Sequence, residues 1–544
     1  MFISVVIRAE YTPYSYRANF YQQSLIHCRQ NGWILITNEY MKSHHQEMQD
    51  GISERLLKEF ELERLSKEEL NEVEQYYIPD KLFEDKEASF GSRTEMLLYM
   101  AKERFTELEH CLDGILAQIK EKHPEEKIDG MFYCSETCES FRQVCNKHNI
   151  PLIPYLFSAI KMPHGYRQTL YYANMKGFLY NSTENEDRYH EFENENNQII
   201  PIFTNKEIIA LIGKERTLPL LQVINHKPKY EMGICGECYA IIPSFFAYNP
   251  YTDDDLEGEC KALYKDSEMD IRSHALQLDN IRVDRSEMHN DPAPFILSCK
   301  RLSSARSQIM LKVMMWARTA VMKKNTHSFG FMCEKDYSST KLSDLRALNH
   351  HIFCYLIPND LMFSDEYWKW RMSNPSEVDI YQYHLDFYKK KLNLPDEIFT
   401  EQDTDKRLEL ILRSRGCDED IIGQVMKDDQ NYEIDYYAAT SKFVYNGKSH
   451  WRMNKIVDGK IKSYITIPNE GVKDVEFYPM DDVAAFVKLD KLSINGQIVM
   501  EGLDYKYMRK VAGHYTIDLS GIASEYITIE SEWNYKKIFE YLNS

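Results

Sequence analysis

The first part of the chain alternates between strand-like and helix-like patterns. Continuous apolar runs at residues 1–9 and 150–157 predict buried strands, and residues 21–37 predict a helix followed by another strand. Residues 127–157 show the order strand, helix, strand within one short unit. Because this alternation is typical of a parallel sheet covered by helices, residues 1–200 predict a Rossmann-like domain.

Polar and amphipathic segments interrupt this first series. Residues 40–90 are rich in Glu and Lys and predict a helical insertion whose charges form a solvated face. Residues 92–122 have the spacing of one long amphipathic helix. Residues 181–198 are almost wholly polar and predict a loop or linker before the next domain.

A second alternating series predicts a second Rossmann-like domain over residues 201–430. Its expected strands lie at residues 218–224, 267–274, 301–304 and 318–323. Its expected helices lie at residues 252–266, 293–300 and 307–317. Residues 365–416 are helical in pattern again and are expected to close this domain.

The pattern changes after about residue 431. Short β-rich runs with polar turns between them fill residues 431–544 and predict a β-sandwich accessory domain. The predicted fold class is therefore α/β, with two Rossmann-like domains and a C-terminal all-β sandwich.

Composition fits a soluble globular protein, with 43% hydrophobic and 28% charged residues. The 66 Lys and Arg residues against 85 Asp and Glu residues give a formal charge of −19. This balance argues against a general nucleic-acid binder, since affinity for a duplex depends on neutralising phosphates. We expect no nucleic-acid partner, although a local basic pocket is compatible with the composition.

The twelve cysteines are scattered, and several lie in apolar runs where a free thiol packs as a small hydrophobe. We therefore expect a reducing cytoplasmic location. The longest apolar stretches fall well short of the ~18 residues that a membrane span needs. Peripheral attachment to a membrane stays open.

Hydroxyl and amide side chains gather where the strand at 301–304 passes into the helix at 307–317. In an open α/β sheet, ligands bind beyond the carboxyl ends of the strands, and the free N–H groups of a starting helix favour an anion. Plain capping is the commoner role for any single serine. The cluster favours a phosphate site, to which Arg306 could add charge; its members are Ser303, Ser304, Ser307 and Gln308.

Arg272 and His274 stand where the preceding strand should finish. A histidine beside an arginine suits phosphate or base recognition, although a surface-loop histidine is equally common. Because neighbouring strands would bring this end and the serine cluster to one crevice, each observation strengthens the other.

The first domain offers a second group of candidates. Glu136 follows the strand at 127–134 and is either a general base or an acid that complements a helix dipole. The loop after the strand at 150–157 is rich in side chains that stack on polar rings or hydrogen-bond to them, a mixture that ordinary packed loops share. We predict acceptor binding there by His164, Tyr166, Arg167, Thr169 and Asn174.

The metal-like patterns are weak. Cys235-x-x-Cys238 has no second pair at zinc-finger spacing, and neither His44-His45 nor His350-His351 has a carboxylate frame. Asp253-Asp254-Asp255 opens a predicted helix, where acids are expected anyway. A glycine-rich phosphate loop is absent. We therefore predict no metal and no cofactor other than a co-substrate.

Residues 100–330 resemble GT-B glycosyltransferases, especially bacterial capsule and lipopolysaccharide β-Kdo transferases. "IRSHA" resembles their basic His-Pro motif, with Arg272 and His274 kept and Ala275 in place of proline. "LSSARSQIMLKVMMWARTAVM" resembles their serine-rich turn, apolar helix and strand, with Lys312 where the family helix has Glu and Ala317 where it has Gly.

"TLYYANMKGF" resembles a Thr…Asp-x-x-Gly pattern of the same family, with Thr169 and Gly177 kept and Asn174 where an acid would stand. If that acid is catalytic in relatives, this chain either uses another acid, such as Glu136, or has lost activity. The segment "VEFYPMDDVAAFVKLDKLSING" resembles β-sandwich appendages of bacterial polysaccharide glycosyltransferases.

The resemblance implies two domains facing a cleft and a metal-independent glycosyltransferase of bacterial surface-polysaccharide synthesis. It implies transfer from a nucleotide-sugar donor, such as a CMP-Kdo-like sugar, to a glycan or lipid-linked glycan acceptor. It places Lys312 with the phosphate-binding residues and makes Glu136 and His274 the catalytic candidates. Location at the inner face of the membrane, or with polysaccharide-assembly partners, would fit.

Two alternatives remain open. Asn174 and Lys312 also suit a catalytically inactive GT-B-fold protein that binds glycan or acts as a scaffold in a polysaccharide-assembly complex. A GT-B epimerase or phosphorylase is a third, weaker candidate.

Overall fold

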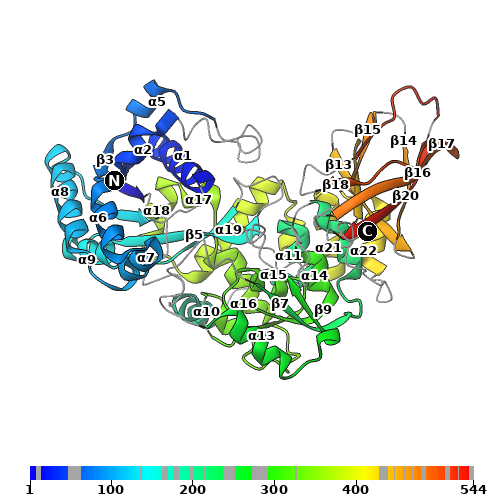
Figure 1. Ribbon diagram of the computed structural model, residues 1–544, viewed down its shortest axis with the longest axis horizontal. Coiled ribbons are helices and arrows are strands. Elements are labelled where there is room, and N and C mark those ends of the chain that lie inside the picture. Colours follow the sequence, from blue (N-terminus) through cyan, green and yellow to red (C-terminus); the bar gives the residue numbers. More distant parts are fainter. Residues whose placement is uncertain are drawn as a thin grey trace.

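The computed structural model of the 544-residue chain shows two parallel-strand sheets with helices around them and a separate antiparallel β region (Figure 1). The structure describes residues 1–7, 14–46, 63–133, 138–161, 169–175, 183–195, 200–213, 215–236, 251–272, 292–324, 327–427, 439–445, 448–457, 460–468, 471–478, 485–508, 515–524 and 526–537.

The first sheet has seven strands. Their order is β11 (Ile357–Pro358), β6 (Thr169–Ala173), β5 (Leu152–Lys161), β4 (Gly130–Tyr133), β1 (Phe2–Val6), β2 (Ile34–Asn38) and β3 (Gln75–Ile78). Strands β1 to β5 run parallel, whereas β6 and β11 are antiparallel additions. The apolar runs of β1, β2 and β4 are buried on both faces, as the sequence pattern predicts.

Two hydrophobic clusters cover the faces of this sheet. One cluster holds Leu108 and Phe141 against the strands, and the other holds Trp33 and Trp368. The helices of this half are α1 (Tyr14–Asn31), α2 (Glu39–Ser43), α5 (Lys67–Asn71), α6 (Asp80–Phe90), α7 (Arg93–Lys102), α8 (Thr106–Lys122), α9 (Glu139–His148), α17 (Asn359–Met362) and α18 (Asp365–Arg371).

Three expectations for this half need correction. The segment 40–90 is not wholly helical, because β3 pairs in parallel with β2 as an edge strand of the sheet. The helix expected at 92–122 is broken into α7 and α8 at residues 103–105. The chain also returns to this half late, since β11 extends the first sheet and Trp368 of α18 packs on Phe132.

The second sheet is parallel, in the order β8 (Met269–Arg272), β7 (Tyr230–Cys235), β9 (Cys299–Ser303) and β10 (Thr319–Val321). Helices α13 (Asp253–Lys261), α14 (Ala293–Ser298) and α15 (Ile309–Met315) alternate with these strands. Thr252 caps α13 as expected: its hydroxyl accepts from the Asp255 N–H, and the Asp255 carboxylate accepts from the Thr252 N–H in return.

One strand of this series was expected in the wrong place. Residues 215–223 form the 3-10 helix η3 (Glu215–Val223), and the strand is β7 instead. Pro219 explains the difference, because a proline has no N–H to give to a central sheet ladder.

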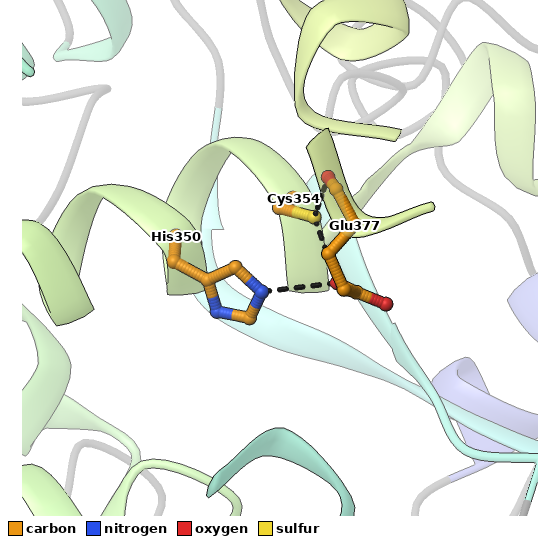
Figure 2. A group of neighbouring side chains, drawn as sticks. All are labelled: His350, Cys354 and Glu377. Atoms are coloured by element: carbon orange, nitrogen blue, oxygen red, sulfur yellow. Dashed lines mark hydrogen bonds and ion pairs between the residues drawn. The ribbon is translucent and has the colours of Figure 1, made fainter. Parts of the chain in front are cut away.

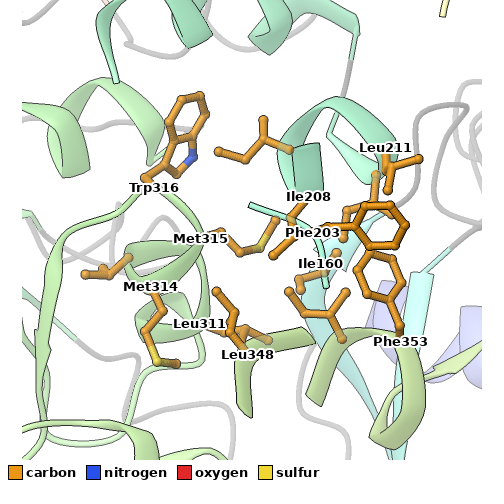
Figure 3. Packing of buried hydrophobic residues seen from close by; sticks show 14 of the residues in the cluster. Ile160, Phe203, Ile208, Leu211, Leu311, Met314, Met315, Trp316, Leu348 and Phe353 are labelled. Carbon is orange, nitrogen blue, oxygen red and sulfur yellow. The ribbon is translucent and has the colours of Figure 1, made fainter. Parts of the chain in front are cut away.

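A third hydrophobic cluster contains residues of both sheets. Ile160 near the end of β5 lies in the same cluster as Leu311, Met314 and Met315 of α15 (Figure 3). Strand β5 therefore reaches from the first sheet to the helices of the second, as Figure 1 also shows.

Residues 184–195 form helix α10 (Glu184–Glu195), so the expectation of a loop or linker over 181–198 is wrong there. Tyr189 and Phe192 are buried at helical spacing against α16 (Leu345–His350), the π-helical turn η6 (His351–Tyr355) and α19 (Glu377–Leu392). The helix buries one face although most of its residues are polar, because several of these polar side chains have buried partners.

The remaining helices pack beside the second sheet. They are α11 (Asn205–Ile212), α20 (Glu397–Thr400), α21 (Thr404–Ser414) and α22 (Glu419–Lys427). Arg407 of α21 forms a buried ion pair with Glu207 of α11, which fixes these two helices to each other.

The C-terminal region is antiparallel, as expected. Its strands are β12 (Ala439–Tyr445), β13 (Lys448–Val457), β14 (Lys460–Pro468), β15 (Asp474–Tyr478), β16 (Ala485–Ile494), β17 (Gln497–Glu501), β18 (Lys506–Met508), β19 (Tyr515–Asp518) and β20 (Tyr526–Lys537). Phe477 of β15 stacks on Trp533 of β20 at 4.3 Å within one buried cluster, so strands from the two halves of the strand path pack face to face, as in a sandwich.

Among the described helices, none is both long enough and apolar enough to cross a bilayer.

Candidate functional site

Register places several predicted nucleotide-binding residues at one edge of the second sheet. Arg272 pairs with Cys235, and Ser303 pairs with both Ile234 and Val321, at the carboxyl ends of the four strands. Strand β7 lies between β8 and β9, so the Arg272 and Ser303 backbones are about 10 Å apart. Arg272 is buried, and His274 lies outside the described residues.

The serine hydroxyls at the end of β9 already have hydrogen-bond partners, one in the neighbouring strand β10 and the others in the turn that leads into α15. The Ser303 hydroxyl donates to the Val321 carbonyl at 2.9 Å. The Ser304 hydroxyl accepts from the Ser307 N–H at 2.9 Å, and the Ser307 hydroxyl accepts from the Ile309 N–H at 3.4 Å. A phosphate that contacted these hydroxyls would have to replace or share these bonds.

Helix α15 is short and begins without a side-chain cap. Gln308 occupies its N-cap position, and Lys312 lies half-buried on its second turn. Because the helix has only seven residues, its dipole supports an anion less than the sequence pattern suggested.

Two buried residues that the sequence did not single out as a pair hold this edge together. His327 contacts the carbonyl of Arg306 through Nε2, and the Arg306 guanidinium donates to the Tyr251 carbonyl. Burial lowers the pKa of His327 to about 4, so its ring is neutral and its Nε2–H is the donor. The segments that follow β9 and β10 are thereby joined.

Asn174 lies at the corresponding edge of the first sheet. Its N–H donates to the Pro154 carbonyl at 3.1 Å, and Pro154 is in register with Tyr133, the last residue of β4. Thr169 starts β6 opposite Lys161. The other predicted residues of this half lie outside the described residues; they are Glu136, His164, Tyr166 and Arg167.

A buried carboxylate stands beside Asn174. The Met175 N–H donates to Glu184 Oε2 at 3.1 Å, and Glu184 is only 4% exposed. Sequence reasoning missed Glu184 because it assigned this segment to a linker. The spacing of Tyr189 and Phe192 on the same polar segment was the available signal of a helix with a buried face.

The first turn of α10 connects the two edges. Asn185 Nδ2 donates to the Ser328 carbonyl at 2.8 Å and lies 2.9 Å from His351 Nδ1. Ser328 follows His327 at the edge of the second sheet, and Glu184 contacts the edge of the first. The carboxyl ends of both sheets therefore approach the same turn of α10.

A charged cluster is buried next to this turn, and Figure 2 shows three of its members, His350, Cys354 and Glu377. Arg188 donates to Glu377 through Nε at 2.7 Å and Nη2 at 3.1 Å. His350 Nε2 and Cys354 Sγ also lie 3.0 and 3.1 Å from Glu377 Oε2. The expectation that His350 has no carboxylate neighbour is thus wrong, because the fold brings Glu377 to it.

The pKa shifts in this cluster follow from burial and pairing. Burial alone would raise the pKa of Glu377, but Arg188 and the hydrogen bond from His350 hold it well below its usual range. Burial lowers the pKa of His350, although Glu377 opposes the shift, and burial raises the pKa of the Cys354 thiol well above its usual value. The cluster is therefore an Arg–Glu ion pair surrounded by neutral donors.

His350, Cys354 and Glu377 could in principle hold a metal ion, since their ligand atoms lie within 4.8 Å of one another. However, the Glu377 carboxylate already bonds to Arg188 at both oxygens, and a cation would have to displace this buried guanidinium. Zinc also needs Cys354 as a thiolate, which burial disfavours. This donor set therefore fits a structural ion pair better than a metal centre.

Comparison with known proteins gives a family match over the first third of the chain. Residues 1–183 match the model of the glycosyltransferase 99 family N-terminal domain. No curated protein sequence matches the chain.

Two solved structures from Thermosulfurimonas dismutans are similar over part of the chain. KpsC, described as a beta Kdo 2,4 transferase, has 10% identity and a TM-score of 0.26, covering 41% of this chain and 78% of its own. KpsC, described as a beta Kdo 2,7 transferase, has 12% identity and a TM-score of 0.29, covering 45% and 86%. These TM-scores are too low to carry an argument about this fold. The family match confirms the resemblance to glycosyltransferases that the sequence showed, and it does so over residues 1–183.

Proposed function

We propose that this protein is a glycosyltransferase that transfers a sugar from a nucleotide-sugar donor to a glycan acceptor in bacterial surface-polysaccharide synthesis. The observation that carries the proposal is the approach of both carboxyl edges to the first turn of α10, since ligands of open α/β sheets bind at such edges. The family match over residues 1–183 supports the same activity.

The second sheet would bind the donor as one Rossmann-like half of a GT-B enzyme. Arg272 ends β8, with His274 two residues later in the sequence, and the turn at 303–308 begins at the end of β9, so both strand ends would contact the nucleotide phosphates. Lys312 would add positive charge to the same site. Donors placed around the leaving phosphate stabilise the charge that develops as the bond breaks.

The first sheet would bind the acceptor. In the reaction, an acceptor hydroxyl oxygen bonds to the anomeric carbon, and the bond from that carbon to the phosphate oxygen breaks. The nucleotide leaves with the electron pair, and the hydroxyl proton passes to a base. No step needs a metal ion or an oxidant.

Glu184 joins Glu136 as a candidate for the base. Its carboxylate accepts from the N–H of Met175, the residue that follows Asn174, and the family pattern has an acid at the Asn174 position. Glu184 therefore provides a carboxylate in the region where Asn174 replaces the acid of the family pattern.

A CMP-activated sugar such as Kdo is the proposed donor, and a glycan or lipid-linked glycan is the proposed acceptor. We place the reaction in the cytoplasm, at the inner face of the membrane where a lipid-linked acceptor would be reached. His274 would contact the phosphate directly.

Nucleotide binding tests the donor site. We expect CMP, but not UDP or GDP, to raise the melting temperature of the full chain, because a ligand that binds only the folded state stabilises it. His274→Ala should abolish the shift, whereas His190→Ala, at an exposed position of α10, should retain it. No shift with any nucleotide would contradict the proposal and favour the inactive glycan-binding alternative that Asn174 suggests.

Turnover tests the base. Glu184→Gln should lower transfer by roughly 10²–10⁴-fold, as removal of a general base does, while the CMP-induced shift persists. Glu191→Gln, on the exposed face of α10, should leave transfer unchanged. If Glu184→Gln transfers normally and Glu136→Gln does not, the base is Glu136.

A further inference from the structure

The outer face of the C-terminal sandwich carries two strongly exposed tyrosines. Tyr464 on β14 is 70% exposed, and Tyr526 on β20 is 55% exposed. Two exposed aromatic side chains on one sheet face are candidate contacts for a ligand, because covering them removes apolar surface from water.

Register shows that both tyrosines belong to the same face. Tyr464 lies opposite Glu530, and Thr466 lies opposite Thr528, with 3.3 Å between the two threonine Oγ1 atoms. The alternate residues of both strands point inward; they are Ile465, Ile467, Ile527 and Ile529. Because side chains alternate along a strand, the outer face holds the tyrosines with the threonine pair between them.

The distance between the tyrosines suits an extended ligand. Tyr526 lies four residues from Glu530, the partner of Tyr464, so the two positions are about 13 Å apart along the strands. This span is longer than one sugar ring. We call the set Tyr464, Thr466, Tyr526, Thr528 and Glu530 the tyrosine platform.

The tyrosine platform continues sideways across the sheet. Ser493 of β16 lies opposite Glu530, and its Oγ is 3.5 Å from Glu530 Oε2. Ile498 of β17 lies opposite Ser493 and is 53% exposed. One row of the outer face therefore runs from Tyr464 through the exposed Glu530 to Ile498, whereas Ser493 in the same row is only 3% exposed and supports Glu530 from below.

This combination matches the chemistry of a carbohydrate chain. The C–H faces of sugar rings pack on aromatic rings, and sugar hydroxyls exchange hydrogen bonds with threonine hydroxyls and carboxylates.

We propose that the tyrosine platform binds a polysaccharide chain, either the growing acceptor or the finished product, away from the transferase site. The identity of the glycan rests on the proposed function, whereas the binding surface does not. Holding the chain on the sandwich would keep its end near the transferase domains during repeated additions.

Affinity electrophoresis of the full chain tests this proposal. The probe is lipid-free surface polysaccharide from the source organism cast into native gels, with dextran of similar size as the reference. We expect the polysaccharide to retard the protein more than dextran does. Tyr464→Ala and Tyr526→Ala should each weaken binding by about tenfold, as truncation of a central aromatic anchor does.

Matched variants separate ring stacking from folding. Tyr464→Phe keeps the ring and should keep most of the binding, whereas Phe90→Ala, an exposed aromatic position outside the sandwich, should change nothing. No retardation of the wild type, or retardation that both alanine variants retain, would overturn the proposal. A dimer that dissociates in the alanine variants without any glycan binding would also overturn it and identify the face as a contact between copies.

The outcome is independent of the transferase proposal. Tyrosine variants should keep the CMP-induced shift and transfer to a short acceptor. If no nucleotide binds but the tyrosine-dependent retardation persists, the platform stands and the proposed enzyme activity fails.

Discussion

Two arginine–glutamate pairs are buried in this protein with almost the same geometry. Arg407 donates to Glu207 through Nε at 2.6 Å and Nη2 at 2.9 Å, and Arg188 donates to Glu377 at 2.7 and 3.1 Å. All four side chains are less than a tenth exposed. The two pairs therefore differ in their surroundings rather than in their bonds.

Arg407 completes its bonding with the backbone carbonyls of Ile202 and Glu401. It fixes two helices and contacts no predicted site residue among those described. Arg188, by contrast, lies one helical turn after Glu184, and its partner Glu377 also bonds to His350 and Cys354. The comparison indicates that one pair only stabilises the fold, whereas the other also positions the helix that connects the two sheet edges.

The largest effects are expected from Arg407→Met and Arg188→Met. Each leaves a buried carboxylate without its partner, which costs about 3–5 kcal/mol. Denaturant unfolding should show a similar loss for both. At a temperature where both variants are folded, only Arg188→Met should also lower transfer, because α10 carries Glu184. Equal activity in the two variants would contradict the distinction.

The region around Arg188 also contains or adjoins buried histidines, which should make the stability of the protein depend on pH. Burial lowers the pKa of His384 to about 3 and that of His327 to about 4, and it also lowers the pKa of His350. Each ring is neutral in the folded state but charged in the unfolded state below pH ~6.5, so stability is complete above that pH and is lost as pH falls.

Between its folded and its unfolded pKa, each such histidine lowers the free energy of unfolding by up to about 1.4 kcal/mol for each unit by which the pH falls. Glu377 acts in the same direction at lower pH, since its folded pKa is depressed and its contribution is lost as it becomes protonated. Between pH 7 and 4, the melting temperature should therefore fall less steeply with decreasing pH for His384→Gln than for the wild type. His190→Gln should leave the slope unchanged, and an unchanged slope for both would show that His384 is not held neutral.

The smallest effect is expected from metal ions. Because Arg188 occupies both oxygens of Glu377, neither Zn²⁺ nor a chelator should move the melting temperature of the wild type. A zinc-dependent increase that Cys354→Ser removes would show instead that the cluster exchanges its arginine for a metal.

Much of the element order was predictable from the sequence. Buried parallel strands such as β1 and β4 read as continuous apolar runs, and the alternation with helices identified both parallel sheets. Strand β3 was hidden in a charged segment because three of its four side chains are only half-buried at the sheet edge. The apolar run around Pro219 was misleading because its composition suits a strand but its proline does not.

The candidate site was predictable only in part. The turn at 303–308 and Arg272 do lie at one sheet edge, but the hydrogen bonds of Ser303 and Ser304 depend on how β10 and α15 pack. Glu184 was missed because a helix that buries charged residues looks like a solvated linker when its partners are unknown.

The sequence by itself determined the succession of two α/β series and a β-rich tail, because periodicity and turn residues act over a few neighbouring positions. Tertiary structure alone decided which charges are buried and paired: Glu377 lies 189 residues from Arg188 and 27 from His350. Burial of a charged side chain is stable only when the fold supplies a partner, and a partner so far away in the sequence cannot be inferred from the neighbouring residues.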